Sequence, residues 1–290
     1  MEAIKQVVVL GHSGFIGQHL MRSIGAQYPH LTLTGRSHSD LDLTKPTNAR
    51  EVADLFQPDT AVVMLSGIKR QFGDNLEIFR DNLSMVENVC RVLTDQRPAR
   101  FVYFSSTAVY GEDIHNTWIT EMTSPYPTSY YGLAKFTSER LLANVYGEDA
   151  KPQLLVLRPP LIYGPGDPAE TYGPVGFAKK AVRGEEIVTW GDGTELREFL
   201  YVRDAVDLTM RLVNSSVSGV LNLVSGESRS FRDILEITKE YEVDLRVCER
   251  DRSKDRVDHV FDPSLLLSNA EGFEFTTLRS GIEYTIESLR

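Results

Sequence analysis

Tyr131 and Lys135 stand four residues apart, a spacing at which two side chains could together move a proton. On a helix both would lie on one face, so that the lysine ammonium could favour the ionised form of the phenol. A tyrosine in that setting can exchange a proton with a sugar hydroxyl or with a ketone. Such pairs also occur on ordinary amphipathic helices, so the elements around the pair decide its meaning.

A glycine-rich turn is the second feature that could do chemistry. Gly11, Gly14 and Gly17 follow a predicted strand and open a predicted helix. In that setting backbone amides and the helix N-terminus can bind a pyrophosphate. Gly11 would allow the tight turn, Gly14 the close approach of the ligand, and Gly17 the packing of the helix on the strand. An ordinary strand-to-helix turn is the alternative.

Short apolar runs alternate with helical patterns through the first two thirds of the chain. We predict strands at 6–10, 31–35, 60–65, 101–105 and 153–158, and helices at 15–27, 47–56, 76–96 and 129–147. Strands that are apolar on both faces indicate a parallel sheet covered by helices on both sides. The C-terminal ends of these strands would share one edge, where Gly11, Ser66, Ser106 and Arg158 fall.

Composition narrows the class of protein. The chain has 290 residues, of which 41% are hydrophobic, and a formal net charge of -10. This charge argues against nucleic acid or an anionic membrane as the main partner, because both need a basic face. Neither the histidines nor Cys90 and Cys248 have metal-ligand spacing, so we predict no metal site. The chain has no long apolar segment, and we expect a cytoplasmic protein with reduced thiols.

Together, the glycine-rich turn, the strand-end serines and the Tyr/Lys pair resemble the extended short-chain dehydrogenase/reductase family. These proteins are NAD(P)-dependent epimerases, dehydratases and reductases of sugar nucleotides. Further matching segments are Ser105-Ser-Thr-Ala-Val-Tyr-Gly111, Arg158-Pro-Pro-Leu-Ile-Tyr-Gly-Pro-Gly166, Asp192-Gly-Thr-Glu-Leu-Arg-Glu-Phe-Leu-Tyr-Val202 and Gly219-Val-Leu-Asn-Leu-Val-Ser-Gly226. The resemblance implies a Rossmann-type doubly wound parallel sheet that binds NAD(P) in residues 1–160. It implies a smaller substrate-binding lobe mainly in residues 161–290, with some segments returning to the large domain.

The resemblance also assigns roles to individual residues. Tyr131 would be the catalytic acid/base, and Lys135 would lower its pKa and bond the nicotinamide ribose. Tyr130 is the neighbouring competitor, but only Tyr131 has the family's spacing from Lys135. The implied coenzyme-binding residues are Gly11, Ser13, Gly14, Phe15, Ile16, Gly17, Arg36, Asp42, Leu43, Leu65, Ser66, Gly67, Asn82, Tyr131, Lys135, Arg158 and Pro159.

Ser106 holds the position of the family's Ser/Thr, which hydrogen-bonds the reacting oxygen. Ser105 and Thr107 are the other candidates, and both could instead cap backbone groups. Thr107 is also implied to contact the substrate. The resemblance therefore completes a catalytic set of Ser106, Tyr131 and Lys135.

Two arginines bear on the ligands. Arg36 ends the second predicted strand, where NAD-specific members of the family carry an acidic residue for the adenosine ribose. Arg36 could instead pair with a 2′-phosphate, which favours NADP over NAD, although an exposed loop arginine is the alternative. Arg197 resembles the family's contact to the substrate diphosphate, which a guanidinium can bind with two hydrogen bonds. A surface salt bridge with Glu195 or Glu198 is the alternative for Arg197.

The resemblance implies a nucleotide-diphosphate sugar as the substrate and a homodimer as the assembly. Helices 76–96 and 129–147 resemble those of the family's four-helix dimer interface. Leu83, Val86 and Val89 could equally face the sheet.

The choice among reactions rests on a few positions. The family's dehydratases carry an Asp-Glu pair where this chain has Thr107-Ala108, so a 4,6-dehydratase is not expected. Thr107 also replaces the cysteine of the bifunctional epimerase/reductases. A 4-ketoreductase that consumes NADPH and a 4-epimerase that retains NAD both remain, and Arg36 and the compact chain favour the reductase. A non-catalytic NADP-binding regulator is the third possibility, against which the complete catalytic set argues.

Overall fold

The computed structural model describes residues 4–147, 154–170, 173–241, 245–252 and 255–290. The chain folds into two compact units. The first consists of Met1–Glu112, Thr123–Pro159 and Val206–Asn222, and the second of Asp113–Met122, Pro160–Ala205 and Leu223–Arg290. The sequence prediction divides the chain near residue 160 and lets some later segments return to the large domain. In the structure Val206–Asn222 lies in the first unit and Asp113–Met122 in the second. Which ligand each unit binds remains a prediction.

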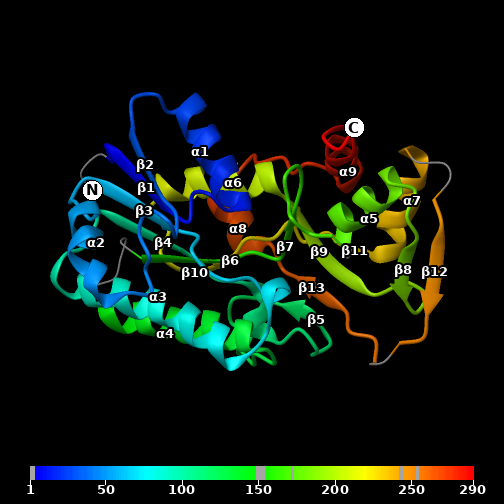
Figure 1. Ribbon diagram of the computed structural model, residues 1–290, viewed down its shortest axis with the longest axis horizontal. Helices are drawn as coiled ribbons and strands as arrows, with labels where there is room; N and C mark the ends of the chain where they lie inside the picture. Colours follow the sequence, from blue (N-terminus) through cyan, green and yellow to red (C-terminus); the bar gives the residue numbers. More distant parts are fainter. Residues whose placement is uncertain (1–3, 148–153, 171–172, 242–244, 253–254) are drawn as a thin grey trace. The chain divides into compact units, whose positions relative to one another are not determined.

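A six-stranded sheet, parallel at every pairing, forms the centre of the first unit (Figure 1). Its strands, in spatial order, are β10 (Gly219–Asn222), β6 (Leu154–Arg158), β4 (Arg100–Phe104), β3 (Thr60–Met64), β1 (Gln6–Leu10) and β2 (Thr32–Arg36). The chain runs from β1 outward to β2, then returns to β3 on the other side of β1. The order therefore reverses between β1 and β3, the position at which open α/β sheets bind ligands.

Helices cover both faces of this sheet (Figure 1). On one face lie α2 (Ala49–Leu55), α3 (Leu76–Asp95) and α4 (Tyr130–Tyr146). On the opposite face lie α1 (Phe15–Gln27) and α6 (Val202–Val213), which carry the linked side chains Ser23 and Asp207. The expected doubly wound α/β fold is confirmed, and the predicted strands and helices of this unit end within two residues of the observed ones, residue 153 lying outside the described ranges.

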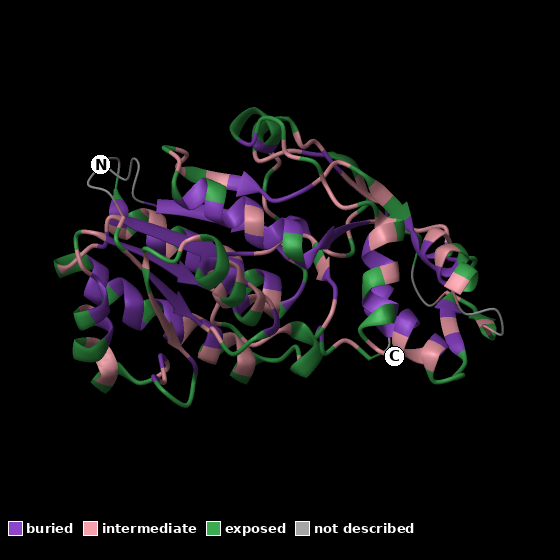
Figure 2. Ribbon diagram, turned by 90° about the horizontal axis from the view of Figure 1, so that it is seen from above, coloured by how far each residue is buried: buried purple, intermediate pink, exposed green. Residues whose placement is uncertain are grey.

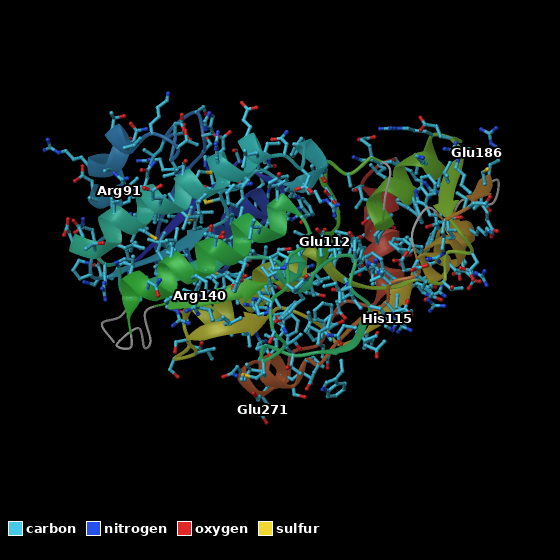
Figure 3. The ribbon with its side chains drawn as sticks, turned by 90° about the horizontal axis from the view of Figure 1, so that it is seen from below. Arg91, Glu112, His115, Arg140, Glu186 and Glu271 are labelled. Carbon is cyan, nitrogen blue, oxygen red and sulfur yellow. The ribbon has the colours of Figure 1, made fainter. Side chains whose placement is uncertain are left out.

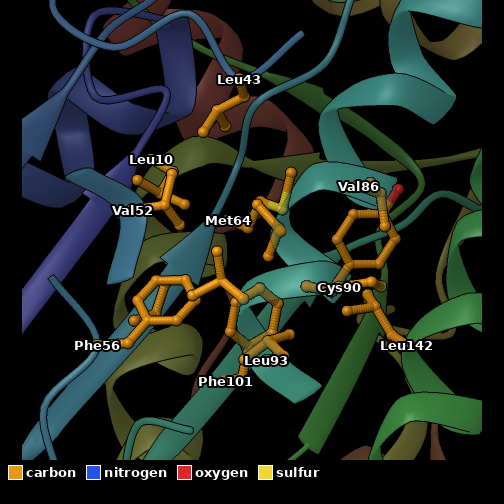
Figure 4. Packing of buried hydrophobic residues seen from close by; sticks show 14 of the residues in the cluster. Leu10, Leu43, Val52, Phe56, Met64, Val86, Cys90, Leu93, Phe101 and Leu142 are labelled. Atoms are coloured by element: carbon orange, nitrogen blue, oxygen red, sulfur yellow. The ribbon is translucent and has the colours of Figure 1, made fainter. Parts of the chain in front are cut away.

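Alternation along the strands builds the main core. Val8, Leu10, Val62 and Met64 point to the same face of the sheet and pack against residues of α2, α3 and α4 (Figure 4). The intervening strand residues are equally buried on the other face, as the burial colours show (Figure 2). Strands buried on both faces need apolar residues at nearly every position, which explains the runs seen in the sequence.

The α3 and α4 helices pack against each other as well as against the sheet. Val86 and Val89 of α3 are buried in the core, so these two side chains face the sheet. Leu83 is half-buried. The predicted homodimer therefore cannot use Val86 or Val89 as contacts without unfolding this core.

The second unit has smaller sheets. Its strands are β7 (Leu161–Tyr163), β9 (Leu196–Tyr201) and β11 (Ser228–Ser230) in one sheet, β8 (Ile187–Trp190) with β12 (Val247–Arg250), and β5 (Asn116–Ile119) with β13 (His259–Phe261). Its helices are α5 (Gly173–Val182), α7 (Phe231–Tyr241), α8 (Ser264–Asn269) and α9 (Leu278–Glu287). An aromatic-rich core that includes Tyr163, Phe199 and Phe231 joins α5, α7 and α9 to β7, β8 and β9. Among the described residues of the whole chain, none of the helices has the length and apolar character to cross a membrane.

Candidate active site

The glycine-rich turn connects β1 to α1 and lies against the segment that follows β3. Gly11 has a φ of 89°, and a Cβ added to it would lie 2.9 Å from the backbone nitrogen of Ser66. A Cβ on Gly17 would lie only 2.4 Å from the carbonyl oxygen of Gly11, so α1 packs directly on the turn. These two positions match the tight turn and the close packing predicted for them. A Cβ on Gly14 would meet nothing nearer than that same oxygen, at 3.4 Å.

The N-terminus of α1 is open to an anion. Gly14 is its N-cap, no side chain of the described residues caps its first amides, and its first turn has no acidic residue. The amides and the helix dipole therefore present partial positive charge beside the space next to Gly14. This arrangement fits the pyrophosphate of a dinucleotide such as the predicted NAD(P).

Arg36 lies at the end of β2, next to this turn. Its carbonyl oxygen accepts a hydrogen bond from Gly11 (2.7 Å), and its guanidinium donates to the Gly35 carbonyl (3.0 Å). An acidic group, Asp40, lies nearby and accepts hydrogen bonds from the Ser37 hydroxyl (2.6 Å) and amide (2.9 Å). These two bonds lower the pKa of Asp40, with smaller contributions from His12 and Arg36. The sheet edge at β2 thus carries both the Arg36 guanidinium and the Asp40 carboxylate. Asp40 was not identified from the sequence.

The other residues predicted near the adenosine make bonds within the protein. Asp42 accepts hydrogen bonds from the hydroxyl (2.6 Å) and amide (3.0 Å) of Thr44, and these hold its pKa below the ordinary value. The carbonyl oxygen of Leu43 accepts from the buried Asn88 (2.9 Å). Both contacts fix the path of the loop after β2.

Asn82 shapes the loop after β3. Its side-chain oxygen accepts from the amide of Ile68 (2.7 Å) and its nitrogen donates to the Ile68 carbonyl (3.0 Å). A Cβ on Gly67 would lie 3.4 Å from Nζ of Lys135 and 3.5 Å from Oδ1 of Asn82. This loop therefore lies beside the lysine of the predicted catalytic set, and a Cβ on Gly67 would be in van der Waals contact with it.

Ser106, Tyr131 and Lys135 are brought together at the end of β4. Ser106 is the N-cap of the short 3₁₀ helix η3 (Thr107–Tyr110), where its hydroxyl accepts from the Ala108 amide (3.1 Å). The Ser106 hydroxyl also interacts with the Tyr131 phenol. Nζ of Lys135 donates to the Phe104 carbonyl (2.7 Å) and lies 5.8 Å from the centre of the Tyr131 ring.

The start of α4 explains why Tyr131 and not Tyr130 enters the site. Ser129 caps the helix by accepting from the Gly132 amide (3.0 Å), and its hydroxyl donates to Glu112 (2.6 Å). Glu112, labelled in Figure 3, also forms a salt bridge with Arg70. With the helix fixed in this way, Tyr130 is exposed and its ring packs near Phe79.

Burial dominates the electrostatics of the pair. It raises the pKa of Tyr131 to about 12, an effect that the hydrogen bond with Ser106 opposes. Burial also lowers the pKa of Lys135 to about 8, against the opposing charge of Glu139. The Lys135 ammonium bonds a carbonyl and faces the ring of the phenol, and the lowering of the Tyr131 pKa by Lys135 that the sequence predicts stays a prediction. At neutral pH the phenol is protonated and the lysine is charged.

Arg158 makes its side-chain contacts inside the protein. Its guanidinium pairs with both oxygens of Glu139 (3.0 and 2.6 Å) and donates to the Tyr110 hydroxyl (2.8 Å). The carbonyl oxygen of Pro159 accepts from the Thr107 amide (2.9 Å). Sequence reasoning missed Glu139, although it stands four residues beyond Lys135 and so continues the spacing of the Tyr/Lys pair.

Arg197 lies on β9 of the second unit and is largely buried. Its guanidinium pairs with Glu195 and donates to the carbonyl oxygens of Leu196 and Val257. The salt bridge with Glu195 left open by the sequence is therefore present. Glu198 instead accepts hydrogen bonds from Ser225 and Gly226.

The model of the NAD dependent epimerase/dehydratase family matches residues 7–223. The chain belongs to this family. It is accordingly an enzyme, and the resemblance identified in the sequence is confirmed.

Relatives of the chain in the epimerase/dehydratase family include reductases. A dTDP-4-dehydro-6-deoxy-D-allose reductase from Streptomyces bikiniensis is 28% identical, with 99% of this chain and 96% of the relative covered. A GDP-6-deoxy-D-mannose reductase from Pseudomonas aeruginosa is 27% identical over 84% of this chain and 83% of the relative. The structure of a UDP-glucose 4-epimerase from Thermus thermophilus, in complex with NAD, has a TM-score of 0.84 at 24% identity, covering 98% of both chains. That likeness shows the shared fold.

Gly14 and Gly17 should respond differently to substitution. Gly14→Val should fold with nearly normal thermal stability but lose coenzyme binding, because its side chain would enter the space beside the α1 amides. Gly17→Val should lose thermal stability, because a Cβ there overlaps the Gly11 carbonyl. Thermal unfolding and coenzyme fluorescence measure both effects. Normal coenzyme binding by folded Gly14→Val would show that the turn is only structural.

The protonation of Lys135 should make coenzyme binding depend on pH. Below about pH 8 Lys135 carries its proton and a charge that can bond the ribose, and above it the charge is lost. We therefore expect coenzyme affinity to fall as the pH rises through about 8. Titrations across that range with Lys135→Ala as the control test this, since the variant should bind weakly with no such fall. An equal fall in the variant would assign the limit to another group.

Proposed function

We propose that this enzyme is an NAD(P)-dependent oxidoreductase that reduces the 4-keto group of a nucleotide-diphosphate sugar. The observation that carries the proposal is the meeting of a protonated Tyr131 phenol with Ser106 and the Lys135 ammonium at the end of β4. Reductases of a dTDP-sugar and a GDP-sugar among the relatives support it. Thr107 and Arg197 are the residues we propose for binding the sugar and its diphosphate.

The residues of the first unit fit the division of labour that such a reduction needs. When bound, the coenzyme supplies the hydride. The Ser106 hydroxyl and the Tyr131 phenol orient and polarise the carbonyl oxygen, and Tyr131 then donates its proton to that oxygen. Lys135 stabilises the phenolate that remains, because its ammonium lies against the tyrosine ring.

The coenzyme-binding residues follow the edge of the sheet. The Gly11–Gly17 turn and the α1 amides hold the pyrophosphate, Lys135 holds the nicotinamide ribose, and Arg36 holds a 2′-phosphate. Arg36 makes NADP the preferred coenzyme in this proposal. Asp40, whose pKa Arg36 helps to lower, would also allow some use of NAD by accepting hydrogen bonds from ribose hydroxyls.

A 4-epimerase that retains NAD is the second candidate, because it would use the same Ser106, Tyr131 and Lys135. Its first step removes a proton from the sugar hydroxyl, whereas the reductase gives a proton to a carbonyl oxygen. Arg36, which suits NADP, and the reductases among the relatives favour the reductase. A purely regulatory NADP-binding protein would have no need for a buried lysine beside a tyrosine at the strand end.

We also propose a cytoplasmic homodimer. The free cysteines Cys90 and Cys248 fit a reducing compartment. The α3 and α4 helices pack side by side and expose Leu133 together with Arg91 and Arg140, labelled in Figure 3, as a surface for a second copy. Sedimentation of the purified protein over a range of concentrations would reveal a monomer if this assembly were wrong.

Tyr131→Phe should bind NADPH normally but reduce a 4-keto sugar nucleotide ~10²–10⁴-fold more slowly, because it lacks the acid/base. Tyr130→Phe is the matched control and should keep normal turnover, since that ring is exposed. The rate is followed by loss of NADPH absorbance. Full turnover by Tyr131→Phe would exclude the assignment. Protein isolated with stoichiometric NAD that interconverts two sugar epimers without consuming NADPH would establish the epimerase.

Arg36→Ala should weaken NADPH binding by about 1.5–3 kcal/mol, as expected for the loss of a hydrogen bond to a charged group. NADH binding should change little, because NADH lacks the 2′-phosphate. Arg22→Ala, which removes an exposed arginine on α1, is the control. The measurement is a pair of coenzyme titrations for each variant. An equal loss for NADH and NADPH would contradict 2′-phosphate recognition.

A further inference from the structure

Glu139 takes part in a repeated contact between β4 and α4. Three consecutive residues at the strand end meet three residues spaced by one helical turn, in the pairs Phe104–Lys135, Ser105–Glu139 and Ser106–Tyr131. Two of these pairs contain the proposed catalytic residues. The middle pair contains none, yet it lies between them in the strand and fixes the same helix face to the same strand end.

Both carboxylate oxygens of Glu139 accept hydrogen bonds inside the protein. The residue is 3% exposed, accepts the Ser105 hydroxyl, and pairs with Arg158 through both of its oxygens, at 3.0 and 2.6 Å. Arg158 in turn donates to Tyr110 (2.8 Å), whose hydroxyl donates to Asn222 of β10 (2.7 Å). The network thus ties α4 to β4, β6, η3 and β10, which are the elements that surround the proposed catalytic residues.

Stability alone is a poor reason for this ion pair. Taking two charges out of water costs about as much as their attraction returns, and well-packed apolar residues often replace such pairs without loss. A bidentate pair does fix geometry, because its two parallel hydrogen bonds allow only one orientation of the carboxylate. The Glu139–Arg158 pair is therefore better explained by the positions that it fixes for neighbouring side chains.

We propose that Glu139 is a positioning residue which, held by Arg158, sets the register of α4 on the end of β4 and so keeps Tyr131 at Ser106 and Lys135 at Phe104. This inference rests on the proposed function of that site. In the reaction, Glu139 touches neither sugar nor coenzyme. It acts through the helix that it shares with Tyr131 and Lys135.

The charge of Glu139 gives the proposal a second readout. The titratable groups around Lys135 are Tyr131 and Glu139 on its own helix and Tyr103 on β4, while Gly67 and Asn82 face it without charge. Burial lowers the pKa of Lys135, and Glu139 opposes this. Removing the carboxylate charge therefore lets Lys135 lose its proton at a lower pH, which should move the alkaline limit of activity and of coenzyme binding downward.

Glu139→Gln is the first test, because it keeps the size of the side chain and removes its charge. We expect kcat for a 4-keto sugar nucleotide to fall ~10–100-fold, as for a small misplacement of catalytic groups, with little change in KM. The alkaline limit of NADPH binding, followed by coenzyme fluorescence, should shift to lower pH. Glu87→Gln is the matched control, since it removes the carboxylate of an exposed ion pair of the same 2.6 Å length and should change neither quantity.

Glu139→Gln leaves Arg158 buried without its partner, so the double variant Glu139→Met with Arg158→Met is the second test. Removing both charges should restore thermal stability, but kcat should stay low and the alkaline limit should stay shifted. Recovery of normal kcat and pH dependence together with stability would reduce the pair to a structural role and overturn the proposal.

The outcomes separate this proposal from the proposed function. If the unmodified enzyme reduces no keto sugar nucleotide, the proposed function fails, while the pH dependence of NADPH binding in the variants still tests Glu139. If the enzyme is an active reductase and both variants match it in kcat and in pH dependence, the proposed function stands and the positioning role of Glu139 is wrong.

Discussion

The buried Lys135 ammonium limits how the first unit can be built. A charged amine that leaves water must find partners, and this one has the Phe104 carbonyl at 2.7 Å and the ring of Tyr103 at 4.9 Å. These partners only partly replace water, which is why the pKa of Lys135 falls to about 8. The free-energy cost of burying the Lys135 ammonium is offset by the large apolar core between α3, α4 and the sheet. That core holds α4 in place.

A different constraint acts on the glycine-rich turn. There, backbone segments lie so close together that a side chain would not fit between them. Gly11 and Gly17 have no room for a side chain because the protein itself fills the space, whereas the space at Gly14 is open. A sequence pattern of three glycines does not distinguish these cases. The distinction matters for function, because a glycine required by the fold says nothing about a ligand and a glycine beside exposed helix amides does.

The sequence predicted the elements well and the side-chain partners poorly, and the three residues of the predicted catalytic set lie together in the structure. Alternating apolar runs placed the strands of the sheet within two residues, because burial on both faces leaves a local signature. The position of Ser106 after β4 and the four-residue spacing of Tyr131 and Lys135 are also local. Glu139 and Arg158, by contrast, are 19 residues apart and meet only after α4 docks beside β6, so no local pattern reveals that the arginine is occupied.

The same distinction bears on the proton of Tyr131. The spacing predicts that Lys135 favours the ionised phenol, and in the fold its ammonium lies 5.8 Å from the centre of the Tyr131 ring while Ser106 interacts with the hydroxyl. Burial raises the pKa of Tyr131 to about 12, so the phenol holds its proton at neutral pH and has one to give to a carbonyl oxygen. The same shift makes the phenol a weaker acid. Proton transfer in the proposed reduction therefore depends on a group that stabilises the phenolate, which is the role proposed for Lys135.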